Sequence, residues 1–168
     1  MVLNLKHRSL SDFAAMSAQD MNAIVVRATG LETALRDGTA QSPLRGLNLG
    51  LLCDTDGNAE AALFQRAASA LGAQVAHLHP KLSELSSPQE VQDTARILGR
   101  LYDAVECVGM APALVGRIGV EAGVPVFDGI ASPRHPTAWL AGLLRGGAGH
   151  EEDRRCLVIQ AVLLGALA

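Results

Sequence analysis

The chain has 168 residues, a net charge of −3 at neutral pH, 49% hydrophobic residues and only 3% aromatic residues. This length supports one domain with a substantial core, which Ala, Leu, Val and Ile must build as helices packed on a buried parallel sheet. The negative charge excludes the basic surface on which nucleic-acid binding depends, so we expect no nucleic-acid partner.

Cysteine usage and hydropathy indicate a soluble, cytoplasmic protein. The three cysteines are widely spaced and odd in number, which is not typical of a disulfide framework. The N-terminal residues lack the apolar core of a signal peptide, and the apolar stretch 156–168 is too short to span a bilayer. We therefore expect no membrane association.

The first half of the chain predicts two helices and two strands. Ser17 and Asp20 have the spacing of a capping box, and apolar residues then recur at helical spacing until about Gly38. The next predicted elements are a strand over 47–53, a helix over 59–71 and a strand over 73–78.

The second half continues this alternation after a serine-rich loop at 81–87. Ser87, Pro88 and Glu90 combine an N-cap, a proline at the first helical position and a capping glutamate. Strands that alternate with helices predict an α/β fold, a three-layer α/β/α domain with a four-stranded parallel sheet. The remaining elements are a helix ending near Arg100, a strand over 102–108, a helix over 112–122, a strand over 124–127 and a helix over 136–144.

The C-terminal region is a glycine-rich linker followed by an apolar helix. The linker covers residues 145–150, and the helix over 151–168 has acidic residues in its first turn, as the helix dipole favours. Nearly every position from Cys156 onward is apolar. Such a helix must be buried, either on its own domain or in an oligomer interface.

The turn between the first predicted strand and the following helix has the geometry of an anion site but the wrong charge. A helix that begins directly after a parallel strand offers backbone N–H groups and its dipole to a phosphate. Here the turn carries Asp54, Asp56 and Glu60, with no Arg or Lys before Arg66. We interpret the acids as solvated residues favoured near a helix N-terminus, with a cation or amine site as the alternative.

Two segments resemble a known family. Residues 93–106 (DTARILGRLYDAVE) and 124–144 (VPVFDGIASPRHPTAWLAGLL) closely resemble the carbamoyl-phosphate-binding half of the aspartate/ornithine carbamoyltransferases, the ornithine branch in particular. The opening residues 6–10 and the segment 43–46 resemble the same family. The helix over 151–168 resembles the family's C-terminal helix, which packs back on the first domain.

This resemblance implies a domain organisation and an assembly. Residues 1–144 form a carbamoyl-phosphate-binding-like domain, residues 145–150 replace the amino-acid-binding domain, and residues 151–168 complete the first domain. Because relatives assemble through this domain, the resemblance implies a homotrimer. In the serine-rich loop, which in the family reaches a neighbouring subunit's site, Glu84 and Pro88 replace a Gln and a Lys.

The resemblance also locates the family's ligand site, and most of its side chains have changed. Both arginines of the Ser-Thr-Arg-Thr-Arg phosphate loop are absent, and a third arginine is replaced by Val108. The His-Pro-x-Gln motif keeps its histidine and loses its glutamine. Since each Arg–phosphate hydrogen bond contributes about 1.5–3 kcal/mol, we expect no tight binding of carbamoyl phosphate. The positions of this degenerate family site are Gly57, Asn58, Ala59, Glu60, Ala61, Val108, His135 and Ala138, of which His135 is retained.

These changes predict a catalytically inactive relative without a cofactor. Its function would be association with itself or with a full-length paralogue. The alternative is a small-molecule-binding domain for a ligand that is not a dianion, or a transferase of altered chemistry, at the carboxyl ends of the strands.

Further interpretations concern a possible metal site and the side chains of His135 and Trp139. Cys53, Asp54, Cys107 and His135 follow strand ends and are possible zinc ligands, but their spacing is no metal signature and buried cysteines usually act as small apolar residues. We therefore expect no metal. For His135, which precedes a proline at a helix start, a structural role is favoured over ligand binding. Trp139 is expected in the core or an interface.

Overall fold

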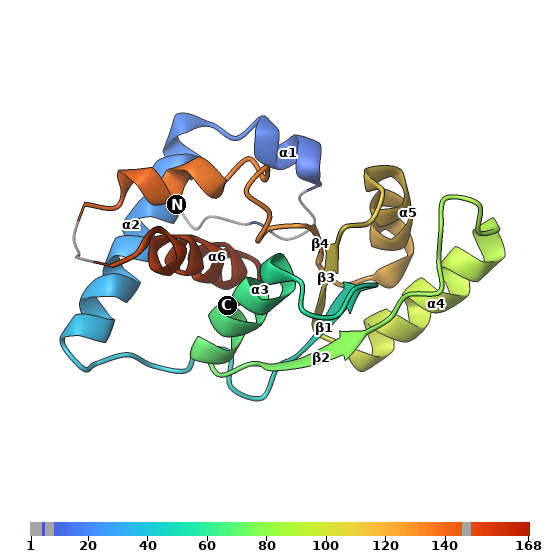
Figure 1. Cartoon of the computed structure of the whole chain (residues 1–168), viewed down its shortest axis with the longest axis horizontal. Coiled ribbons are helices and arrows are strands. Elements are labelled where there is room, and N and C mark those ends of the chain that lie inside the picture. The colour runs from blue at the N-terminus through green and yellow to red at the C-terminus, as the bar shows by residue number, and fades with distance from the viewer. Residues whose placement is uncertain (1–4, 6–8, 146–148) are drawn as a thin grey trace.

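A parallel sheet of four strands forms the centre of the structure (Figure 1). The computed structural model describes residues 5, 9–145 and 149–168. The strands lie in the order β2-β1-β3-β4, so β1 and β3 are central and β2 and β4 are the edges. All pairs are parallel, which confirms the predicted sheet. The strands are β1 (Asn48–Cys53), β2 (Gln74–Leu78), β3 (Ala104–Val108) and β4 (Val126–Asp128).

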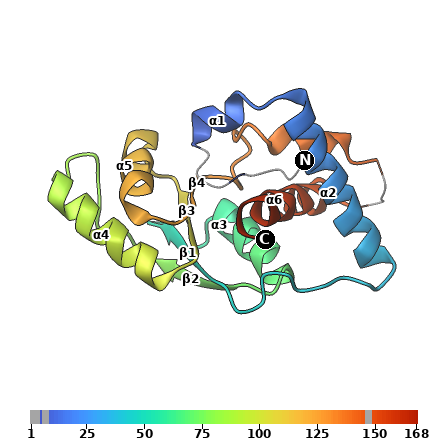
Figure 2. The same cartoon turned by 180° about the vertical axis from the view of Figure 1, so that it is seen from behind.

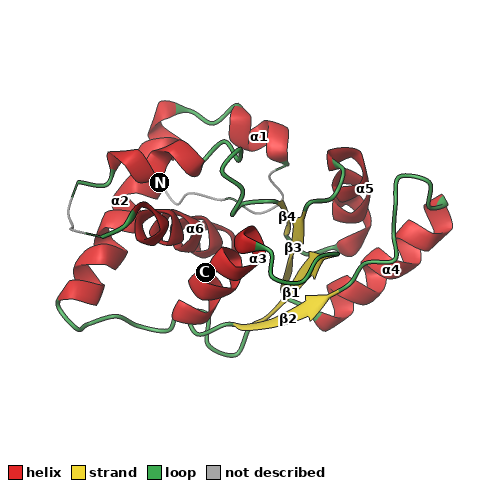
Figure 3. Cartoon of the chain, in the orientation of Figure 1, coloured by secondary structure: helices red, strands yellow, loops and turns green. Residues whose placement is uncertain are grey.

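Helices cover both faces of this sheet (Figures 2 and 3). Each face has its own apolar cluster: Leu49 and Phe64 belong to one, and Leu52 and Ile118 to the other. This arrangement confirms the predicted three-layer α/β/α fold. On the first face lie α2 (Ala18–Arg36), α3 (Ala59–Ala70) and α6 (Glu151–Leu167), on the second α4 (Pro88–Leu101) and α5 (Pro112–Ala122), and the short elements are α1 (Leu10–Ala14) and the 3-10 helix η1 (Ala138–Leu143).

Side-chain caps place the helix starts where the sequence indicated them. Ser87 Oγ accepts the backbone N–H of Glu90, and a Glu90 carboxylate oxygen accepts that of Ser87 at 2.7 Å, which is the predicted capping box. The helix α1 was not predicted, although Ser9 and Asp12 form the same type of box in front of it. At five residues it is too short for an apolar periodicity to show.

The segment after His135 is not the regular helix predicted over 136–144. It forms the 3-10 helix η1, in which Leu140 N–H donates to the Thr137 carbonyl and Leu144 N–H to the Ala141 carbonyl. The backbone N–H of Thr137 donates to the His135 side chain, and that of Ala138 to the His135 carbonyl. Because these hydrogen bonds span two or three residues, the start of the segment forms tight turns and not an α-helix.

Helix α6 is buried on its own domain. It lies against α2, α3 and η1, and its residues from Cys156 to Leu163 are all buried. The burial predicted from its apolar surface is therefore confirmed, and it is achieved within one chain. The linker predicted at 145–150 lies partly outside the described residues, which omit 146–148. No helix in the described ranges is long and apolar enough to cross a membrane.

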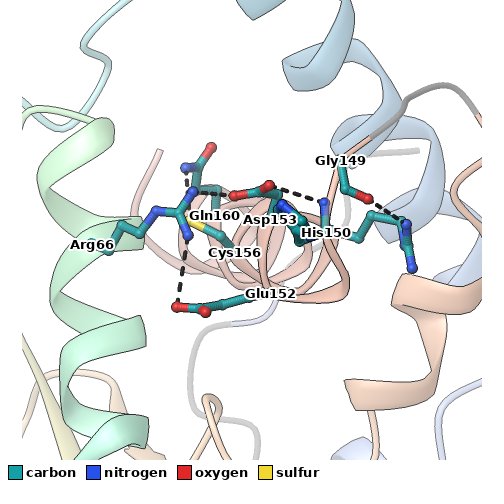
Figure 4. A network of polar contacts seen from close by, with 8 residues as sticks. Arg66, Gly149, His150, Glu152, Asp153, Cys156 and Gln160 are labelled. Carbon is teal, nitrogen blue, oxygen red and sulfur yellow. Dashed lines mark hydrogen bonds and ion pairs between the residues drawn. The ribbon is translucent and has the colours of Figure 1, made fainter.

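A polar network fixes the first turn of α6 (Figure 4). Arg66 of α3 forms an ion pair with Asp153 and lies 3.8 Å from a carboxylate oxygen of Glu152. Arg154 donates to the Gly149 carbonyl at 2.8 Å. Exposed ion pairs contribute about 0–1 kcal/mol each, so the network orients the helix while its apolar burial holds it.

Candidate functional site

The turn after β1 ends in an asparagine that caps α3. Asn58 Oδ1 accepts the backbone N–H groups of Glu60 and Ala61 at 2.9 and 3.0 Å. Gly57 precedes it with φ +70°, a conformation that favours glycine. The two N–H groups are donors of the kind that a phosphate uses at a helix N-terminus. In this protein they are occupied by the chain's own side chain.

Removal of the Asn58 carboxamide should destabilise the protein. Asn58→Ala leaves two backbone donors without their partner, and the loss of such a cap costs about 1 kcal/mol. We expect Asn58→Asp, which keeps an acceptor oxygen at the same place, to stay close to the wild type. Urea denaturation of the three proteins measures the difference, and an Asn58→Ala midpoint equal to the wild-type midpoint would contradict the capping role.

The neighbouring acids are solvent-exposed, and only a small hollow lies beside them. Asp54 and Asp56 are exposed, and Asp56 Oδ1 lies 3.8 Å from His79 Nε2. The hollow has a volume of about 130 Å³ and is lined by the turn 55–58 together with Cys53, Gln65 and His77. The predicted solvated state of these two acids therefore agrees with their exposure.

A buried glutamate lies in the middle of β3. Glu106 is 0% exposed, and its carboxyl group accepts the backbone N–H of Gly129 at 2.6 Å and that of Ile130 at 3.0 Å. Burial raises the pKa of Glu106 to about 8, while the two backbone donors act in the opposite direction. This carboxyl group ties the end of β3 to the loop that follows β4.

His135 is held as a neutral imidazole with one nitrogen unpaired. Its Nδ1 accepts the backbone N–H of Thr137 at 3.2 Å and lies 2.8 Å from the Thr137 hydroxyl. Since a backbone N–H only donates, Nδ1 carries a lone pair and the proton resides on Nε2. Burial and then the charge of Arg155 lower the pKa of His135 to about 4.

The second nitrogen of this imidazole is a buried donor without a partner. His135 is 4% exposed, and its Nε2 makes no hydrogen bond to the described residues. The edge of the ring packs on Phe13 of α1, with ring centroids 4.9 Å apart. These contacts are consistent with the structural role predicted for His135. The Nε2–H group remains available to donate a hydrogen bond, for example to a carbonyl oxygen.

Arg155 of α6 brings a cation to the same end of the sheet. Its Nη2 donates to the carbonyls of Ala131 and Ser132 at 2.8 and 3.0 Å. Burial lowers the pKa of this guanidinium, and Glu60 acts to raise it. The sequence placed no Arg or Lys near the turn, because Arg155 is close to it only through the docking of α6.

Four chain segments therefore converge on one charged cluster. Glu60 lies near enough to raise the pKa of both Glu106 and Arg155, and Arg155 acts on His135. The cluster combines a guanidinium, two carboxyl groups and a neutral imidazole. The Arg155 guanidinium already donates to two backbone carbonyls, so fewer of its N–H groups are available to a phosphate dianion.

The remaining family positions are apolar. Val108 is buried at the end of β3, and Leu63 of α3 is buried in the same apolar cluster. Ala138 lies at the start of η1, and Ala59 and Ala61 are in the first turn of α3. These side chains offer no hydrogen bond to a ligand.

The candidate zinc ligands do not form one group. Cys107 pairs with Leu52 and Cys53 pairs with Val108 in the β1–β3 register, so the two thiols belong to the apolar clusters on opposite faces of the sheet. Asp54 is exposed, whereas His135 is buried. No group of three or more His, Cys, Asp or Glu side chains in the described part of the chain is arranged to hold a metal ion.

Sequence reasoning did not single out Glu106 and Arg155 as parts of the site. A charged residue inside an otherwise apolar strand was an available signal for Glu106, because such a group needs partners when buried. No local sequence pattern could have indicated the position of Arg155, because its two acceptor carbonyls belong to residues more than twenty positions away in the chain.

Comparison with known proteins finds relatives of this chain. The model of the aspartate/ornithine carbamoyltransferase carbamoyl-P binding domain matches residues 8–145. The ornithine carbamoyltransferase of Cutibacterium acnes is 37% identical over 144 residues, which are 86% of this chain and 43% of that protein. The catabolic ornithine carbamoyltransferase of Haemophilus influenzae is 33% identical over the same length. The chain thus spans less than half the length of these relatives.

Solved structures give the same fold. Ornithine carbamoyltransferase from Pyrococcus furiosus matches with a TM-score of 0.70 at 23% identity, over 85% of this chain and 46% of that one. Ornithine carbamoyltransferase from Gloeobacter violaceus matches with a TM-score of 0.58 at 28% identity, over 84% of this chain and 42% of that one.

Proposed function

The chain belongs to the aspartate/ornithine carbamoyltransferase family through its carbamoyl-phosphate-binding domain, and we propose that it is a non-catalytic member that acts by association. The observation that carries the proposal is Asn58, whose side chain occupies the backbone donors at the start of α3. The family's phosphate loop falls on these residues.

The charges around the turn support the same proposal. Asp54, Asp56 and Glu60 place negative charge where a phosphate would sit, and the charge of Glu60 also acts on the Arg155 guanidinium. Three family arginines are absent at this site. Carbamoyl phosphate would therefore meet repulsion at the turn and lack most of the hydrogen bonds that hold a dianion.

The surface offers apolar area for association. Leu85, in the loop before α4, is 97% exposed, and Ile97 and Leu101 of α4 are more than half exposed. A groove of about 590 Å³ runs between α4, the end of β2 and residues 80–82, with Ile97 and Leu101 in its wall. Exposed apolar area of this kind is typical of a protein interface. By family resemblance we propose a homotrimer, or a mixed assembly with a full-length paralogue.

Trp139 fits association better than a core position. It is 56% exposed beside Leu143, and both line a hollow of about 230 Å³ with Met21 and Val25 of α2. Of the two places expected for this tryptophan, an interface is the one compatible with its exposure.

Calorimetric titration with carbamoyl phosphate tests the loss of ligand binding. We expect no measurable heat of binding at millimolar ligand and no citrulline or carbamoyl-aspartate when ornithine or aspartate is added. A full-length ornithine carbamoyltransferase in the same buffer is the positive control. Tight binding or detectable product would refute the proposal.

Light scattering after size exclusion tests the association. We expect a mass of three chains for the purified protein, or a mixed species when a full-length paralogue is added. Leu85→Glu together with Ile97→Glu should shift the protein to lower mass without unfolding it, because both side chains are exposed. A monomer at all concentrations, with or without the paralogue, would overturn the association.

A second candidate function rests on His135. Its buried Nε2–H is unpaired, and a carbonyl-containing ligand without a phosphate would satisfy it. Thermal-shift screening against amides, carboxylates and amino acids distinguishes the two functions, since only a binding domain should be stabilised by one of them.

A further inference from the structure

An apolar groove lies between α1 and α5, along the outer edge of β4. Its volume is about 530 Å³, within the range typical of small-molecule sites. Leu10 of α1 forms one wall, Val115 and Val120 of α5 form the other, and Val124 and Val126 form the base. Figures 1 and 2 both show α1 and α5 on either side of the end of β4, which is an edge strand.

Glycines in α5 keep the groove open. A Cβ added to Gly116 would meet no atom within 4 Å, and one added to Gly119 would meet only Val126, at 3.8 Å. Both residues line the groove. Side chains at either position would occupy the space, so the depth of the groove depends on their absence.

One end of the groove is acidic. Asp128, the last residue of β4, is half-buried and lines the groove, as do Ser9 and Ser11. The Asp128 carboxylate makes no hydrogen bond or ion pair to any residue that the structure describes. Its charge acts on two neighbouring titratable groups, Glu106 and Cys107, and neither supplies a positive charge.

We propose that this groove binds an aliphatic ammonium ion, with its alkyl chain along α5 and β4 and its charged nitrogen on Asp128. A half-buried carboxylate to which none of the described residues supplies a cation favours a positively charged group, and the valine and leucine side chains favour methylene groups over polar ones. Carboxylates and phosphates are disfavoured by the negative charge of Asp128.

This site is separate from the cluster around His135 and Arg155. Asp128 pairs with Cys107 and Glu106 with Phe127, so the two carboxyl groups leave the sheet on opposite faces. A test of the ammonium site therefore does not depend on whether the protein associates or binds carbamoyl phosphate.

Titration of the isotope-labelled protein with n-hexylammonium, followed by amide NMR shifts, tests the proposal. We expect saturable shifts of the Gly116, Gly119 and Val124 amide signals. Hexanol, which has the same chain without the charge, should bind about tenfold more weakly, as expected for a lost hydrogen bond between charged groups. Hexanoate should leave these signals unchanged.

Two variants separate the charge from the groove. Asp128→Asn should weaken n-hexylammonium by about tenfold or more and leave hexanol unchanged, whereas Asp37→Asn, at an exposed acid outside the groove, should change neither. Gly116→Leu should fill the groove and abolish binding of both, and the open space at this helical position lets it fold. Equal affinity for n-hexylammonium and hexanol, an unaffected Asp128→Asn variant, or no shifts in the wild type would overturn the proposal.

Discussion

Gly99→Ala should be the most destabilising methyl addition among the glycines of the described helices. Gly99 lies in α4 where that helix crosses α5, and a Cβ there would stand 1.8 Å from the carbonyl oxygen and 2.9 Å from the carbonyl carbon of Ala122. Both atoms belong to the backbone, so a side-chain rotation cannot relieve the overlap. The helices must move apart, and we expect a loss of about 3 kcal/mol or more in the free energy of unfolding.

Gly116→Ala is the matched control for this prediction. It places the same methyl group in α5, at a helical position with nothing within 4 Å, and should stabilise the protein by about 0.5–1 kcal/mol because alanine is the better helix former. Urea denaturation of both variants gives the two free energies. Equal stability of Gly99→Ala and wild type would show that α4 and α5 are not packed as described.

Stability should fall as the pH rises from 6.5 to 8, and Glu106 should be the cause. The pKa of Glu106 is raised from 4.5 to about 8 in the folded protein, so the folded state holds this proton more firmly than the unfolded chain. The resulting stabilisation is complete below pH 4.5 and is lost as the pH rises to 8. By linkage the whole change amounts to about 5 kcal/mol.

His135 gives the opposite slope at lower pH. Its pKa falls from 6.5 to about 4 on folding, so stability is lost as the pH falls from 6.5 towards 4. The pH ranges over which the two residues change stability overlap only below pH 6.5. Of these two residues, only Glu106 therefore contributes to the slope between pH 6.5 and 8. We therefore expect the greatest stability between the two pKa values.

Glu106→Gln isolates the slope. The amide lowers stability by an amount independent of pH, since its NH₂ group faces the Ile130 N–H donor, and it removes the decline from pH 6.5 to 8. Glu84→Gln, in the exposed loop before α4, is the control and should keep the wild-type slope. Denaturant midpoints at half-unit pH intervals measure both, and a slope retained in Glu106→Gln would assign it to another group.

Local chemistry was sufficient to predict most elements of the fold. The box formed by Ser87 and Glu90 marked the start of α4, and the apolar runs separated by helical patterns marked the parallel strands. Asn58, a residue type favoured at helix N-caps, occupies the anion-binding donors at the start of α3. These features depend on residues a few positions apart, where periodicity and capping determine the structure.

The sequence by itself determined the fold class and the family, and its resemblance to that family implies the loss of the arginines from the phosphate loop. Only the tertiary structure brought Arg155 to the carbonyls of Ala131 and Ser132 and joined Glu106 to the loop after β4. It also set Cys53 and Cys107 on opposite faces and left His135 Nε2 without a hydrogen bond to the described residues. Each of these depends on strand register or on the docking of α6, which join residues distant in the chain. Short-range patterns cannot encode such contacts, because many partners satisfy the same burial and charge until the packing selects one.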